Sequence, residues 1–430
     1  MIDIKAVGNG VFKINILRVL LTLGFLSFYL PNNESVPGVV YKLWRYSALF
    51  VSITAIAIYL VYVITNDIGK KINIRYVSVI LFYVYMYGIT SFFTKAGQFQ
   101  TYRCVYFVGF ITLLELSVHC LKEIDVIKSY LFSGVSATII YALSFIRYFN
   151  VVGGMHHGLR KRLSYGFVVT DQNWYFFTYD NASLFIFLPV AAVFVYYCVK
   201  FNNKSFKFCL MYEALVLLMY LLKSAVSAEV VFAFFVIIST VYFYKFTSRN
   251  KMKINIDYKK TWIIILIFHI MIITIVGSDI AYKIAGYFGK DGSFTGRDVI
   301  WRRAKEYISL SPIFGYGMED TLFKTMKLVF PHCHNILLEI LYDGGIIGFV
   351  LYAVFIINFT PRNNNNFTNS IFNLCLLCYL IGQGFETQLA FPYLIPIFYF
   401  NYYYSSKTNP MEISFKRSIL SKKRKLRITR

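Results

Sequence analysis

Charged residues are scarce in this chain of 430 residues: they make up 15% of it, against about 25% in an ordinary soluble domain. Acidic residues are the scarcest, with 21 Asp and Glu against 44 Lys and Arg. Apolar residues instead account for 57% of the chain, and its mean hydropathy is +0.56. These values argue against a soluble globular enzyme, a disordered chain and a collagen-like chain, and they indicate a polytopic membrane protein.

The chain also lacks the motifs that would link its net charge of +23 to nucleic acid. It has no zinc-finger or RNA-binding signature, and apolar segments interrupt its basic runs. No P-loop or other Gly-rich nucleotide motif is present either. We therefore expect membrane lipid and an anionic substrate as partners, and no nucleic acid.

A disulfide framework is missing as well. Most of the seven cysteines lie in or at the ends of apolar runs, where Cys acts as a small hydrophobe. The pair Cys375-x-x-Cys378 falls inside a predicted span, which argues against a redox or zinc site there. The first 30 residues show no small-residue cleavage site, so we expect them to form an uncleaved first helix.

Long apolar runs are what the sequence has in abundance. Because a helix needs about 20 apolar residues to cross a bilayer, twelve spans would use about 240 residues, nearly the whole apolar stock. The expected fold class is therefore all-α, a polytopic integral membrane protein with about twelve transmembrane helices. The predicted spans are 14–30, 43–65, 76–94, 104–121, 129–149, 182–200, 208–222, 228–246, 261–277, 335–357, 370–388 and 389–404.

Basic residues predict the sidedness of these spans. With both termini in the cytoplasm, most basic residues of the short loops lie inside, as the positive-inside rule requires. The short outer loops keep only Lys42, Lys95, Arg103 and Lys223. Two longer outer loops, 150–181 and 278–334, are basic against this bias, either because long translocated loops escape the rule or because they bind an anion. We predict one transmembrane domain over 1–404, with an active site formed by these two loops, and a basic cytoplasmic tail over 405–430.

The loop 278–334 carries its own helix signals. Thr295 and Asp298, three residues apart, resemble a capping box. Ile300 and Ala304 then recur one turn apart on one face, whereas the neighbouring arginines fall on other faces. The sequence predicts an amphipathic helix at the outer surface, with its apolar side against the bundle or the lipid headgroups.

A histidine-containing segment, residues 331–335, directly precedes an apolar span. The positive end of a helix dipole lies at such a start, which favours an uncharged imidazole that can accept a proton. It also favours negative charge nearby. From position alone, His334 is either a proton acceptor or an interfacial helix cap. The adjacent His332, Cys333 and His334 lack a distant second pair of ligands, so no metal site is predicted.

Polar and glycine residues inside the spans mostly predict packing. Glu115 is expected to be a polar contact between helices, and Gly344-x-x-x-Gly348 permits close helix packing. Glu339 follows His334 within the span, and intramembrane acids are functional candidates. We expect Glu339 either to orient His334 through a partner or to pair with an arginine.

Four motifs follow one another in the second half of the chain: Gly296-Arg297-x-x-Ile300-Trp301, Pro312-x-x-Gly315-Tyr316-Gly317, His334-Asn335-x-x-Leu338 and Gly345-Ile346-Ile347-Gly348. Their order, their spacing and their position between two spans resemble the signature of the O-antigen ligase/polymerase superfamily. The closest resemblance is to a Wzy-type O-antigen or capsular repeat-unit polymerase. Three upstream segments resemble the superfamily more weakly. They are Arg162-x-x-x-Gly166, Asp180-Asn181 and Lys223-Ser224-Ala225. The second lacks the Pro-Asn pair that is usual there, and the third has Lys where Arg is often seen.

The resemblance implies a glycosyltransferase that uses undecaprenyl-diphosphate-linked oligosaccharides on the outer face of the bacterial cytoplasmic (inner) membrane. It assigns His334 as the catalytic base and Arg297 as the clamp on the diphosphate. The further candidates for substrate binding are Arg162, Lys223, Arg302, Arg303, Asp180 and Asn181. Because the leaving group is already a diphosphate, no metal and no other cofactor is expected. A chain-length regulator and a flippase are further expected partners.

Three activities remain open from the sequence. A polymerase moves the growing glycan onto another lipid-linked repeat unit, whereas an O-antigen ligase moves the finished glycan onto lipid A-core with the same Arg and His chemistry. A flippase or exporter of lipid-linked oligosaccharide belongs to a different class, and it should show repeat symmetry and cationic residues near the midplane. The basic and His residues here concentrate in two asymmetric outer loops instead. This distribution favours a transferase over a transporter, and we favour the polymerase.

Overall fold

The computed structural model describes most of the chain outside its long loops and its ends. The described residues are 10–29, 31, 36–65, 73–93, 101–150, 163–164, 167–168, 175–177, 181–223, 226–247, 256–275, 278–280, 283, 286, 297–318, 333–361, 367–384 and 392–405. Two predicted site residues, Arg162 and Asp180, lie outside the described residues, as do much of both predicted outer loops and almost all of the predicted tail.

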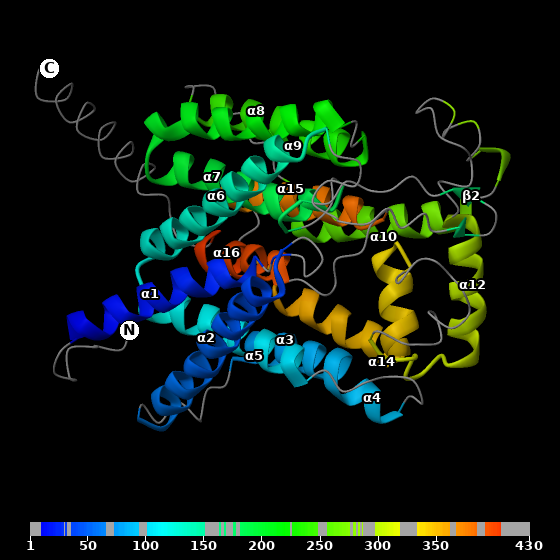
Figure 1. The fold of residues 1–430 in the computed structure, drawn as a ribbon, viewed down its shortest axis with the longest axis horizontal. Helices are drawn as coiled ribbons and strands as arrows, with labels where there is room; N and C mark the ends of the chain where they lie inside the picture. Colours follow the sequence, from blue (N-terminus) through cyan, green and yellow to red (C-terminus); the bar gives the residue numbers. More distant parts are fainter. Residues whose placement is uncertain are drawn as a thin grey trace, which may run out of the picture.

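Each of the twelve predicted spans overlaps a helix, so the polytopic helical fold is confirmed (Figure 1). These helices are α1 (Gly10–Phe28), α2 (Gly38–Thr65), α3 (Ile74–Val84), α5 (Thr101–Cys120), α6 (Glu123–Arg147), α7 (Leu184–Lys200), α8 (Phe206–Lys223), α9 (Val226–Thr247), α10 (Tyr258–Ile275), α14 (Ile336–Asn358), α15 (Phe367–Gly382) and α16 (Ile395–Ser405). Among the described residues, 7 helices are long and apolar enough to cross a membrane: α2, α5, α6, α8, α9, α10 and α14. The apolar segments Asn15–Phe28, Ile74–Ile89, Leu184–Lys200 and Ser370–Gly382 are shorter.

The remaining elements are short, apart from α12 (Arg297–Leu310). The π-helix η3 (Tyr85–Ile89) and α4 (Thr90–Phe93) continue α3. Three 3-10 helices are η4 (Asn181–Ser183), η5 (Asn203–Ser205) and η6 (Pro392–Leu394). The strands β1 (Leu163–Ser164) and β2 (Phe167–Val168) pair antiparallel, with Leu163 opposite Val168 and Ser164 opposite Phe167. This small hairpin, which the sequence did not predict, lies in the loop 150–181, and the other regular elements among the described residues are helical.

The centre of the molecule is formed by helices that are apolar on every side. Nearly all residues of α7 are buried, and so are most residues of α16. α7 packs against α6, α8, α9 and α15, and α16 packs against α5 and α15. The outer helices instead expose apolar side chains such as Phe50, Phe132, Ile237 and Ile357. A helix that is hydrophobic all round belongs in a core, and exposed apolar side chains at this density belong against lipid.

α2 and α5 approach each other closely at Gly109. A Cβ added there would lie 2.2 Å from the Cβ, 2.4 Å from the Cα and 2.7 Å from the carbonyl oxygen of Ser52. Backbone atoms cannot yield as a flexible side chain can, so Gly109→Ala must push the two helices apart. We expect this substitution to destabilise the protein by about 1–3 kcal/mol, measured as a lower melting temperature in detergent. Gly38→Ala on α2 is the control, because no atom lies within 4 Å of its added Cβ; equal melting of both variants would contradict the packing.

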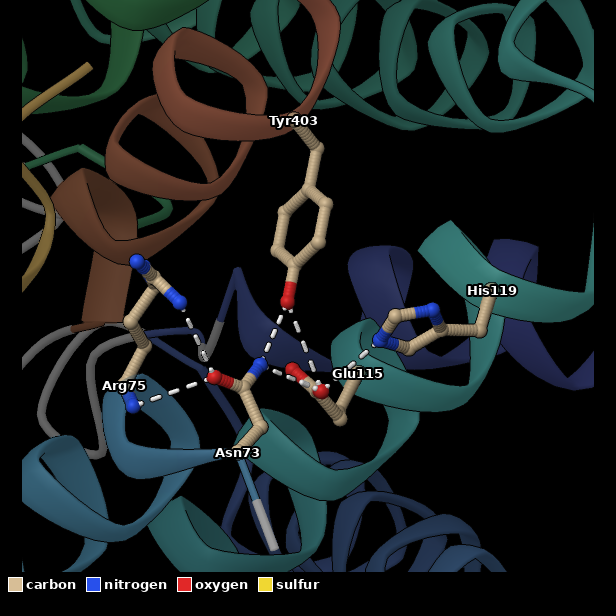
Figure 2. Close-up of polar contacts among 5 residues, drawn as sticks. All are labelled: Asn73, Arg75, Glu115, His119 and Tyr403. Atoms are coloured by element: carbon tan, nitrogen blue, oxygen red, sulfur yellow. Dashed lines mark hydrogen bonds and ion pairs between the residues drawn. The ribbon is translucent and has the colours of Figure 1, made fainter. Parts of the chain in front are cut away.

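A polar cluster joins three helices where α3 begins and where α5 and α16 end (Figure 2). Asn73 caps α3 by accepting a bond from the Arg75 N–H at 3.2 Å, and its amide donates to Glu115 at 2.8 Å and to the Tyr403 hydroxyl. His119 contacts the same Glu115 oxygen at 3.0 Å. The prediction that Glu115 is a polar helix contact is confirmed, because its Oε1 contacts Asn73, His119 and, at 3.5 Å, the Tyr403 hydroxyl, which belong to three elements.

α12 lies across the opposite end of the molecule from the start of α1 (Figure 1). Its residues Ile300, Trp301 and Ala304 are buried against α14 and the end of α10, whereas Arg302 and Arg303 are exposed. The predicted amphipathic helix is therefore confirmed, and its apolar side rests on the bundle. On the predicted topology, this end of the molecule is the outer one.

Candidate functional site

α14 is broken at Gly345, and the two halves of the helix run in different directions (Figure 1). Gly345 has φ 61° and ψ −162°, a region that only glycine adopts readily. A break in a membrane helix leaves backbone groups that must find other partners, because each unsatisfied group costs several kcal/mol there. One such partner is the Tyr85 hydroxyl, which donates to the Gly344 carbonyl at 2.9 Å.

The turn 312–317 supplies most of the replacement bonds. The N–H groups of Tyr316 and Gly317 donate to the carbonyls of Tyr342 and Asp343, and those of Ile346 and Ile347 donate to the carbonyls of Pro312 and Ile313, all between 2.8 and 3.3 Å. The break deprives carbonyls before Gly345 of helical donors and amides after Gly345 of helical acceptors. One turn, 312–317, supplies partners for both groups. The second motif, 312–317, and the fourth motif, 345–348, therefore bind each other. We call this contact between the turn and the broken helix the interlock.

Glycines make this interlock possible. Gly315 has φ 68°, and an added Cβ would lie 2.5 Å from the Tyr342 carbonyl oxygen. At Gly345 an added Cβ would lie 2.3 Å from the Ile313 carbonyl oxygen. Gly344 faces the sulfur of Met86 in η3, 2.5 Å from its added Cβ. The predicted close packing at Gly344-x-x-x-Gly348 is confirmed, and its partner is the π-helix.

A buried hydrogen bond fastens α12 to the segment before α14. The Trp301 indole Nε1 donates to the Cys333 carbonyl oxygen at 2.7 Å, and Ile300 packs with Leu338 in the same apolar cluster. Arg297 is half-buried and lies four residues before Trp301, so the two side chains share one face of α12. The first and third motifs therefore meet at a junction, which we call the α12–α14 junction and define by Arg297, Trp301, Cys333 and His334.

His334 is held in an unusual conformation at this junction. It is buried, with 6% of its surface exposed, and its φ of 52° makes it the one non-glycine residue with positive φ in the described part of the chain. Such a conformation costs about 1–3 kcal/mol and persists only where the surroundings hold it. The residue before it, Cys333, is bonded at both backbone groups: its carbonyl to Trp301, and its N–H to the Glu339 carboxylate at 2.5 Å.

The residue after His334 is fixed as well. Asn335 caps α14, with its Oδ1 accepting from the N–H groups of Leu337 at 3.0 Å and Leu338 at 3.3 Å. Its amide nitrogen lies 3.1 Å from Nδ1 of His269 in α10, whose Nε2 lies 2.9 Å from the Leu380 carbonyl oxygen. With the Asn335 amide donating to Nδ1, Nε2 carries the proton and donates to Leu380. The two neighbours of His334 are thus held by Trp301 of α12 and His269 of α10, and His269 is held in turn by Leu380 of α15.

Cys333 is unsuited to nucleophilic chemistry. Its side chain is fully buried, and this burial raises the pKa of the Cys333 thiol well above its ordinary value. The carboxylates of Glu339 and Asp343 raise it further. A thiol that stays protonated near neutral pH is a poor nucleophile. Within residues 333–335, the imidazole of His334 is therefore the group suited to accept a proton.

Comparison with known proteins bears on these same elements. Residues 175–353 match the family model described as O-antigen ligase. This match supports the resemblance of the segment to the O-antigen ligase/polymerase superfamily. No curated protein and no solved structure matches the chain. The apolar helices and the superfamily together make it a multi-pass membrane enzyme that processes glycans, and the superfamily implies lipid-linked oligosaccharide substrates.

All four superfamily motifs fall within the matched segment, and the described parts of all four converge at one end of the bundle. Ile300 and Trp301 place α12, the turn 312–317 fastens the broken α14, and Asn335 begins that helix. The motifs that look separate in the sequence are therefore parts of one structural unit. That unit presents Arg297 and His334 at the α12–α14 junction.

Among the other predicted site residues that the structure describes, Arg302, Arg303 and Lys223 have polar contacts with residues outside this junction. Arg302 and Arg303 are on the exposed side of α12, paired with Asp298 at 4.0 Å and Glu306 at 2.8 Å. Lys223 ends α8 and donates to the Phe149 carbonyl, with its Nζ 4.3 Å from the Phe149 ring centroid. Asn181 begins η4. Substrate binding by these residues, and by Arg162 and Asp180 outside the described residues, stays a prediction.

Three features of the site were not predicted from the sequence. They are the break at Gly345, the bond from Glu339 to the Cys333 backbone, and the contact of His269 with Asn335. The adjacent pair Gly344-Gly345 inside an apolar span was a usable signal for the break. The partners of Glu339 and His269 carried no local signal, because both bonds depend on how distant segments meet.

Proposed function

We propose that the protein is a polysaccharide repeat-unit polymerase of the outer face of the bacterial inner membrane. It moves a growing glycan from undecaprenyl diphosphate onto a sugar hydroxyl of another lipid-linked repeat unit. The observation that supports this most is the bond from Trp301 to Cys333, which holds the helix that begins at Arg297 against the segment that carries His334. A cation for a diphosphate and an imidazole for a hydroxyl proton are the two groups that this transfer needs.

The transfer balances with these two groups alone. The acceptor hydroxyl oxygen forms a bond to the anomeric carbon of the donor glycan, and the bond from that carbon to the diphosphate oxygen breaks. The diphosphate leaves with the electron pair, and the imidazole of His334 takes the hydroxyl proton, an effect worth about 10²–10⁴ in rate. Arg297 binds diphosphate oxygens through charge-assisted hydrogen bonds and stabilises the departing charge.

In this proposal the donor is already activated by its diphosphate, so neither a nucleotide sugar nor a metal ion takes part. The transmembrane domain over 1–404 binds the lipid portions of both substrates, and the loops 150–181 and 278–334 form the outer active site. Arg162, Lys223 and Asn181 are secondary ligands in it. A flippase that delivers the lipid-linked units and a chain-length regulator are the proposed partners.

The test uses purified protein, an undecaprenyl-diphosphate-linked repeat unit and a metal chelator, without nucleotide sugar. We expect a ladder of products that lengthen by one repeat unit at a time. Transfer only when lipid A-core is supplied would replace the polymerase with a ligase. Unchanged sugar linkages, together with movement of the lipid across a vesicle membrane, would replace it with a flippase.

A further inference from the structure

Glu339 makes a contact that the transfer chemistry above does not use. It lies in the first turn of α14, with 8% of its surface exposed, and its Oε2 accepts the Cys333 N–H at 2.5 Å. The side chain therefore reaches back past Asn335, the cap of its own helix, to a residue that lies before it. Cys333 is outside α14, and the carboxylate supplies the acceptor that its buried N–H needs.

This contact completes a pair of anchors on Cys333. The Trp301 indole holds the carbonyl, which belongs to the peptide that leads into His334, and Glu339 holds the N–H of the preceding peptide. Two fixed peptides leave Cys333 little freedom in φ and ψ, and they set the direction in which the chain enters His334. Because His334 has a positive φ of 52°, releasing either anchor allows it to relax to a commoner conformation that turns its imidazole elsewhere.

We propose that Glu339 is a positioning residue, which holds the Cys333 backbone so that the His334 imidazole meets the acceptor hydroxyl. This inference rests on the proposed transfer reaction. It assigns Glu339 a role through an accepted hydrogen bond and not through its negative charge. The two roles separate experimentally, because a glutamine in the same place keeps an acceptor oxygen and loses the charge.

The test compares Glu339→Leu with Glu339→Gln in the transfer assay. Glu339→Leu removes the acceptor and should lower kcat by about 10²-fold, the cost of misplacing a catalytic group by about 1 Å. The KM for the lipid donor should not change, because Arg297 is untouched. Glu339→Gln should keep kcat and KM close to the wild-type values. Equal loss in both variants would show that the charge matters and overturn the inference, and so would a wild-type kcat in Glu339→Leu.

A second readout needs no glycan transfer. In a chain whose other cysteines are replaced, the buried Cys333 thiol should react slowly with a small thiol reagent when Glu339 is present. Glu339→Gln is the reference for Glu339→Leu, because both variants lack the carboxylate that raises the pKa of the thiol and only Glu339→Gln keeps an acceptor oxygen. In Glu339→Leu the thiol should react several-fold faster than in Glu339→Gln, because the segment opens locally more often. This rate still tests the anchor if the wild-type protein makes no product ladder, so failure of the proposed function is distinguishable. Equal labelling of these two variants would overturn the positioning role.

Discussion

His334→Asn is expected to insert and fold like the wild-type protein and to make no long glycan. Asparagine tolerates positive φ better than most residues, so the backbone at 52° is kept while the imidazole is removed. Loss of the proton acceptor should cost about 10²–10⁴ in rate. Arg297→Ala should cost a similar amount, about 10²–10³, because the departing diphosphate loses its guanidinium. The measurement is glycan length in cells whose membranes contain equal amounts of each protein.

Lys305→Ala is the matched control for the arginine. It removes a positive charge from the same helix, but Lys305 is exposed and its Nζ donates to the Ile273 carbonyl oxygen at 3.3 Å, away from the α12–α14 junction. Glycan of full length is expected from this variant. Wild-type chain length in cells that carry either His334→Asn or Arg297→Ala would end the assignment of that residue to the site.

Gly345→Ala is expected to abolish transfer even at temperatures where the protein stays folded. Alanine strongly disfavours φ 61° with ψ −162°, and its Cβ would lie 2.3 Å from the Ile313 carbonyl oxygen. The turn 312–317 must therefore separate from α14, which leaves backbone groups of both segments unpaired. Because α12 leads directly into this turn, the junction that presents Arg297 loses its support.

The comparison with Gly109→Ala makes this prediction specific. Gly109 is the residue of α5 that contacts α2, and it lies far along the chain from the motifs. Its substitution should therefore lower the melting temperature of the protein, and it should not affect transfer below that temperature. Gly38→Ala should change neither quantity. The interlock would lose its assigned role if Gly345→Ala protein polymerised glycan at the wild-type rate.

Hydropathy predicted the helices well because lipid imposes a simple demand: a segment that crosses it must be apolar and must satisfy its own backbone. That demand says little about where a helix breaks. The segment 76–94 was expected as one span, yet it contains the π-helix η3, and α14 breaks at Gly345. Both irregularities are stabilised by distant partners, the turn 312–317 above all, which periodicity within a single segment does not reveal.

The candidate site was predicted in part for a similar reason. Motif order pointed to Arg297 and His334, and the periodicity around Trp301 predicted which side of α12 is buried. The contacts that hold His334 join residues far apart in sequence, such as Asn335 with His269. The structure also separates the basic residues of α12, because it buries part of Arg297 and exposes Arg302.

Binding of undecaprenyl diphosphate, the departing product of the proposed transfer, tests the central claim most directly, because it separates the roles of Arg297 and His334. The affinity is measured for purified wild-type, Arg297→Ala and His334→Asn proteins in the same lipid nanodiscs. We predict that Arg297→Ala binds the lipid about tenfold to a hundredfold more weakly, the loss expected for hydrogen bonds to a charged group, and that His334→Asn binds it like the wild type. Equal affinity of all three proteins would contradict the account, since no guanidinium at position 297 would then be holding the diphosphate.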